Sequence, residues 1–97
     1  MSVLDNVLRE EYDRLQRMRA AMVREYDELP QGYISKKMIR GRPCYYLQRR
    51  DGAKIVSSFV AVDGLPELQG KIEKRNKLKA SIKEIDLNLK KLKRVIK

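Results

Sequence analysis

The stretch that decides the fold is GYISKKMIRGRPCYYLQRRDGAKIVSSFV, residues 32–60. Two of its runs, CYYLQRR and AKIVSSFV, are rich in β-branched and aromatic residues and flank Asp51-Gly52, a dipeptide that favours a two-residue hairpin turn. Residues 41–43, Gly-Arg-Pro, supply a second corner, and YISKKMIR precedes it. The stretch therefore predicts a three-stranded antiparallel β-meander.

The predicted hairpin register places like charges together. With Asp51-Gly52 as the loop, Arg49 would lie opposite Lys54 and Tyr46 opposite Ser57. Like charges directly opposite each other on a sheet are destabilising, and an anionic partner would relieve the repulsion. The alternative is that these long side chains extend into solvent and protect the edges of a small sheet from aggregation.

A first helix is predicted over about residues 3–28, with Ser2 as its cap and Pro30 at its end. Its apolar positions suggest an imperfect heptad seam, which would cover the sheet or the other helix. The seam combines two series that each recur every seven residues. The first is apolar, Met1, Leu8, Leu15, Met22 and Leu29, and the second is half polar, Leu4, Glu11, Met18 and Glu25.

A second helix is predicted from near Pro66 almost to the end of the chain, with Gly70 weakening its early part. Its seam alternates by three and four residues: Leu78, Ile82, Ile85, Leu89, Leu92 and Ile96. At about 1.5 Å per residue, this helix is longer than a short strand can cover. The distal seam therefore needs the first helix or a second copy of the chain.

These elements predict an α+β fold of the α-βββ-α type with coiled-coil-like helix packing. The 97 residues would form a single domain, with a helix over 1–29, a basic β-meander over 30–64 and a basic helix over 65–97. Two layouts remain open: both helices lie alongside the sheet, or they form an antiparallel pair. A homodimer through the helices is also expected, because a chain of this length builds only a thin core.

The charge is distributed unevenly along a chain whose net charge is +10. Residues 1–29 hold five basic and seven acidic side chains, residues 30–64 hold seven and two, and residues 65–97 hold eleven and four. A positive field over the meander and the second helix favours polyanionic partners, either DNA or RNA, or an acidic protein or ribonucleoprotein surface.

Targeting signals and catalytic patterns were not found in the sequence. No apolar run approaches the length of a membrane span and the first residues do not resemble a signal peptide, so we expect a cytoplasmic protein that does not contact membranes. Without histidine, and with Cys44 as its one cysteine, the chain offers no zinc cluster, and it has no glycine-rich phosphate loop. We therefore expect neither an enzyme, nor a metal, nor a cofactor.

The candidate nucleic-acid-binding residues are the cations of the meander together with one tyrosine. Tyr45 and Tyr46 are adjacent on a strand and point to opposite faces, so one of them packs in the core while the other is exposed. The candidate residues are Lys36, Lys37, Arg40, Arg42, Tyr45, Arg49, Arg50 and Lys54.

Residues 30–85 carry a resemblance to a known group. The Tyr-Tyr-Leu strand, the Arg-x-Gly-x-Lys-like hairpin and the charged helix that follows resemble a family of small bacterial and mobile-element proteins, a domain of unknown function. Cys44 and Phe59 depart from the aromatic residues of that pattern. The resemblance implies a meander followed by a helix and a prokaryotic or phage origin, and no activity.

Two functions follow from this reasoning. In the first, the protein is a small basic nucleic-acid-binding protein that contacts the phosphate backbone with the meander and the second helix. In the second, it is a protein-directed adaptor or inhibitor of a nucleic-acid-processing complex, such as a host defence complex met by a mobile element, and it acts through the basic meander or the helical seam.

Overall fold

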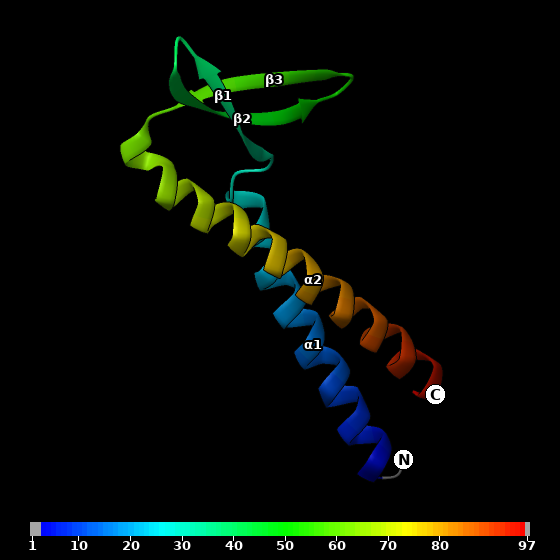
Figure 1. Ribbon diagram of the computed structural model, residues 1–97. Helices are drawn as coiled ribbons and strands as arrows, with labels where there is room; N and C mark the ends of the chain where they lie inside the picture. Colours follow the sequence, from blue (N-terminus) through cyan, green and yellow to red (C-terminus); the bar gives the residue numbers. More distant parts are fainter. Residues whose placement is uncertain (1–2, 97) are drawn as a thin grey trace. The chain divides into compact units, whose positions relative to one another are not determined.

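The computed structural model describes residues 3–96, and its order of elements confirms the predicted α-βββ-α fold (Figure 1). The elements are α1 (Val3–Glu28), β1 (Tyr33–Ile39), β2 (Arg42–Asp51), β3 (Lys54–Val60), a short 3-10 turn (Val62–Gly64) and α2 (Leu65–Val95). Ser2, the predicted helix cap, and Met1 of the predicted seam lie outside the described residues.

The chain forms two compact units. The helical unit contains α1 and the part of α2 from Asn76 onward, and the sheet unit contains residues Leu29–Arg75. The single domain expected over the whole chain stays a prediction.

The sheet is an antiparallel meander in the order β1-β2-β3. Its first turn consists of Arg40 and Gly41, with φ values of 53° and 78°, so it lies one residue earlier than the corner predicted at Gly41-Arg42-Pro43. Pro43 lies within β2, opposite Met38. Proline is tolerated there because β3 pairs with β2 only from Tyr45 onward, which leaves β2 with a single neighbour at that position.

The predicted register of the second hairpin is wrong by two residues. Its loop consists of Gly52 and Ala53, so that Asp51 pairs with Lys54 and Arg49 pairs with Val56. Of the two loop residues only Gly52 has a positive φ, 63°, which is typical of a type II′ turn. The shift replaces the expected like-charge pair by an opposite-charge pair and removes the repulsion that suggested an anionic partner.

The first turns of α2 cover one face of the sheet. In α2, Leu65, Leu68, Ile72 and Arg75 are half-buried at spacings of three and four residues. Ile72 also lines a shallow hollow together with Tyr33 and Ile34, so α2 lies beside the first residues of β1. We call this side of the sheet the covered face. Its half-buried residues are Ile34, Tyr45, Leu47, Val56 and Val60.

The helical unit is an antiparallel helix pair (Figure 1). Early residues of α1 share hollows with late residues of α2, as Tyr12 does with Ile96. Leu15 and Ile85 are its most buried side chains, at 8% and 7% exposure. The helices thus pair within one chain, whereas the expected homodimer stays a prediction.

The seam of α1 differs from the expected one in its second series. Leu8, Leu15 and Met22 are half-buried or buried as predicted, but Leu4 is 66% exposed and Met18 is also exposed. The positions one residue further along the helix are half-buried and also form a three-and-four spacing with Leu8, Leu15 and Met22. They are Asp5, Tyr12, Arg19 and Tyr26.

The described residues include neither a membrane-spanning helix nor a cluster of metal ligands. Within residues 3–96, neither helix has an apolar segment of the length needed to cross a membrane. The same residues contain no cluster of three or more carboxylate, cysteine or histidine side chains placed to hold a metal ion.

Candidate functional site

The face of the sheet opposite the covered face is here called the open face. Alternation along the three strands and their pairing assign its members. Its apolar side chains include Phe59, Ile55 and Tyr33, which are 68%, 64% and 58% exposed. The open face consists of Tyr33, Ser35, Lys37, Ile39, Arg42, Cys44, Tyr46, Gln48, Arg50, Ile55, Ser57 and Phe59.

Two aromatic rings and a cation form the centre of the open face. Tyr46 and Phe59 are cross-strand partners whose ring centroids lie 6.0 Å apart with planes at 77°, an edge-to-face contact. The ammonium group of Lys37 lies 5.3 Å from the centroid of Tyr46, within the range of a cation–π interaction. One face of the Tyr46 ring is therefore taken by Lys37, and Phe59 offers the freer ring.

Hydrogen bonds connect three polar side chains of the open face, Tyr33, Gln48 and Ser35. The Tyr33 hydroxyl donates to Oε1 of Gln48 over 2.6 Å, and Nε2 of Gln48 donates to Oγ of Ser35 over 3.2 Å. These bonds link β1 to β2 through side chains and orient the Gln48 amide. The aromatic face of Tyr33 is therefore presented from a fixed position at the sheet edge.

The predicted site residues are divided between the two faces. Lys37, Arg42 and Arg50 belong to the open face, and Arg40 lies in the turn between β1 and β2. The remaining predicted residues belong to the covered face. They are Lys36, Tyr45, Arg49 and Lys54.

Of the adjacent pair Tyr45 and Tyr46, it is Tyr46 that lies on the open face. The site prediction omitted Tyr46 and Phe59. The strand alternation places Tyr46 and Phe59 together, and the sequence contains that signal. It contains no signal for which of the two faces α2 covers. Tyr45 lies on the covered face, and both tyrosines are half-buried, so the expectation that one of them is exposed was wrong.

The meander keeps its positive charge in the folded sheet unit. Asp51 is the one carboxylate within the three strands, and it lies on the covered face opposite Lys54. Within the described residues 29–75, none of the seven meander cations forms an ion pair. In the same unit Lys71 pairs with Glu67 over 3.3 Å, one helical turn apart in α2. The open face thus carries three cations and no carboxylate.

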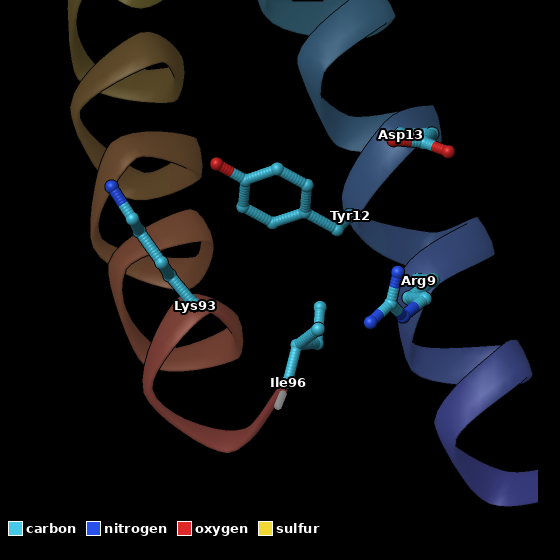
Figure 2. Close-up of a pocket in the computed structure, with 5 residues that line it drawn as sticks. All are labelled: Arg9, Tyr12, Asp13, Lys93 and Ile96. Atoms are coloured by element: carbon cyan, nitrogen blue, oxygen red, sulfur yellow. The ribbon is translucent and has the colours of Figure 1, made fainter. Parts of the chain in front are cut away.

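The helical unit has a hollow between α1 and α2 that we considered as an active site (Figure 2). The ring of Tyr12 points toward α2, near Lys93 and Ile96, whereas the Asp13 carboxylate points away from it. The acidic side chain and the phenol therefore do not converge on one point, as a general acid and base would. The hollow is a feature of helix packing.

Glu11 and Arg14 form an ion pair on the surface of α1. The Arg14 guanidinium donates two hydrogen bonds to the Glu11 carboxylate, over 2.6 and 3.0 Å. These bonds and the positive charge lower the pKa of Glu11, against a smaller opposing effect of desolvation, and the same carboxylate raises the pKa of Arg14. Such a surface contact supports the helix and performs no chemistry.

The chain belongs to a family described as a domain of unknown function, DUF6788, whose model matches residues 4–70. The match includes nearly all of α1, the whole sheet and the first turns of α2. It therefore starts earlier and ends earlier than the resemblance predicted over residues 30–85, whose motifs and bacterial or mobile-element origin stay predictions. Comparison with curated proteins and with solved structures gave no match.

Proposed function

We propose that the protein binds nucleic acid through the phosphate backbone, using the cations of the meander and the lysine-rich faces of α2. The observation that carries the proposal is the charge of the sheet unit. Seven cations and two carboxylates occupy residues 30–64, and none of those cations is paired within the described sheet unit. Unpaired cations gathered on a small sheet attract a polyanion and release its counterions on binding.

The α2 helix adds a second group of cations. Its lysines are exposed at the helix surface, and Lys71 pairs with Glu67 within α2. A solvated lysine face also keeps a helix soluble without any ligand. The meander is therefore the primary surface in this proposal, and α2 supplies additional cations.

A salt titration with two matched triple variants tests the proposal. Lys37→Ala/Arg42→Ala/Arg50→Ala removes three cations from the open face. The control, Lys36→Ala/Arg49→Ala/Lys54→Ala, removes three from the covered face of the same sheet. Binding of short fluorescent DNA and RNA probes is measured by anisotropy at several salt concentrations.

We expect affinity for these probes to fall steeply with salt in the unmodified protein. If the open face contacts three phosphates, its triple variant lowers the slope of log affinity against log salt by about 2–3, because each contact contributes ~0.7–0.9. The covered-face variant should lower it less. Absence of binding to every probe at low salt would overturn the proposal.

The protein-directed alternative uses the same basic surface. The apolar stripes of α1 and α2 contact each other in the helix pair, so an acidic protein or ribonucleoprotein partner would bind the meander. Recovery of one stoichiometric protein partner after nuclease treatment, together with no probe binding, would replace the first function by this one.

A further inference from the structure

The open face combines aromatic rings with cations in a defined order along the strands. Tyr33, Gln48 and Ser57 form one row across the sheet, and Ser35, Tyr46 and Phe59 form the next. The three aromatic side chains therefore lie in two neighbouring rows at the middle of the face. Phe59 and Tyr33 are exposed and Tyr46 is half-buried. Exposed apolar side chains that gather in one patch mark binding sites more often than scattered single ones do.

Cations lie on both sides of these two rows, along the direction of the strands. Arg50, paired with Ile55, lies at the end near the second turn, and Lys37 and Arg42 lie toward the first turn. Arg42 and Arg50 are eight residues apart on β2, which corresponds to about 26 Å along the strand. That length exceeds a single phosphate site and suits a short extended strand.

We propose that the open face binds single-stranded nucleic acid, with bases stacked on Phe59, Tyr46 and Tyr33 and with phosphates near the cations at either end. This inference rests on the proposed function and names its substrate class. Base–aromatic stacking tolerates any sequence because every base has a π-face, and cations next to the rings follow the backbone. Phe59 is the principal platform, since its side chain is 68% exposed.

Two other occupants fit the open face less well. In a duplex the bases stack on one another, so their faces are not available to Phe59 or Tyr46. A second copy of the chain would bring two open faces together, each with Lys37, Arg42 and Arg50 and without a carboxylate. Six cations in one interface repel each other, whereas the phosphates of a single strand are complementary to them.

Three probes of equal length separate stacking from phosphate contact. The probes are a single strand, the same strand without bases (an abasic sugar–phosphate chain) and a duplex. Each is about twelve nucleotides long, a length within the range of site sizes known for sheet-based binders. Each probe is titrated with the full chain at one low salt concentration, using anisotropy. We expect the single strand to bind more tightly than both the abasic chain and the duplex.

Substitution of Phe59 tests the ring itself. Phe59→Ala should weaken binding of the single strand by about 5- to 150-fold, and Phe59→Leu, which keeps an apolar side chain, should weaken it similarly. Neither should affect the abasic chain. Met38→Ala is the matched control, because Met38 is 62% exposed on the covered face, and it should leave all three affinities unchanged. Circular dichroism verifies that each variant is folded.

A spectroscopic variant gives a second readout. The chain contains no tryptophan, so Phe59→Trp introduces a single reporter on the open face. Its fluorescence should be quenched by the single strand and not by the abasic chain.

Equal affinity for the single strand and the abasic chain, with no effect of Phe59→Ala, would overturn this inference and leave the proposed function standing. Failure of all probes would overturn both, and a dimer that Phe59→Ala dissociates would assign the open face to a second copy.

Discussion

The guanidinium of Arg19 in α1 binds the carboxylate of Asp86 in α2, with Nε donating to Oδ1 and Nη2 donating to Oδ2 over 3.5 Å. The two residues are 67 positions apart in the chain. Arg19 occupies a seam position, next to the buried Leu15 one turn earlier and Ile85 on the partner helix. The ion pair thus joins the two helices at the level of their most buried contacts.

The Arg19–Asp86 pair should contribute modestly to stability, because its side chains are 42% and 48% exposed and water screens their attraction. A double-mutant cycle with Arg19→Ala and Asp86→Ala should give a coupling of about 0.2–1 kcal/mol in urea denaturation. The exchanged variant, Arg19→Asp/Asp86→Arg, should recover part of the stability that Arg19→Asp or Asp86→Arg alone loses. A coupling of zero would contradict a net stabilising contribution of this pair.

The helical unit should depend on Leu15 far more than on an exposed leucine. Leu15→Ala should lower the free energy of unfolding by about 2–3 kcal/mol, near the lower end of the range for buried leucines, because the helix pair has a thin core. Leu87, on the same unit, is 57% exposed, and Leu87→Ala is the matched control with an expected change below about 0.5 kcal/mol. Equal effects in thermal or urea unfolding would contradict the assigned seam.

Gly32 and Gly41 test the entry and the first turn of the sheet. Both have positive φ, 121° and 78°, but a Cβ at Gly32 would overlap the carbonyl oxygen of Gln48, whereas a Cβ at Gly41 would lie in open space. Gly41→Ala should therefore cost only the left-handed backbone penalty of about 1–2 kcal/mol. Gly32→Ala should cost more, since the backbone must also move. Equal unfolding free energies for the two variants would contradict this geometry.

Gly70 offers a stabilising change in α2. It lies within the helix, and a Cβ there would meet nothing within 4 Å. Gly70→Ala should raise the free energy of unfolding by about 0.5–1 kcal/mol, because alanine loses less backbone entropy in a helix than glycine does. A serine at the same position is the comparison, with a smaller gain. Loss of stability in the alanine variant would show that another group contacts Gly70 in solution.

The Glu11–Arg14 contact should make stability depend on pH. Since the folded-state pKa of Glu11 is lowered by the Arg14 guanidinium, its contribution is present above the unfolded-state pKa and is lost as the pH falls through the folded-state pKa. The difference in unfolding free energy between the unmodified protein and Glu11→Gln should thus be largest near neutral pH and shrink in acid. Arg14→Ala should abolish this pH-dependent difference, and its persistence in that background would assign it to another group.

The hairpin turn shows how far local patterns reach. Asp51-Gly52 correctly predicted a turn between two strands, because glycine with φ > 0 is needed at such a loop. Two hairpin loops were compatible with this dipeptide, Asp51-Gly52 and Gly52-Ala53. The structure adopts the second, which sets Asp51 against Lys54 and pairs Tyr46 with Phe59. Cross-strand contacts, which join residues distant in the chain, made that choice.

The sequence by itself determined the kind and order of the elements, because helical periodicity, strand alternation and turn residues act between near neighbours. It also placed the positive charge on the meander. Only the tertiary structure decided that α2 covers the face of Leu47 and leaves that of Tyr46 and Phe59 open, since both faces of the sheet carry apolar side chains. Which face is buried depends on the helix that packs against it, and that is a property of the whole folded unit.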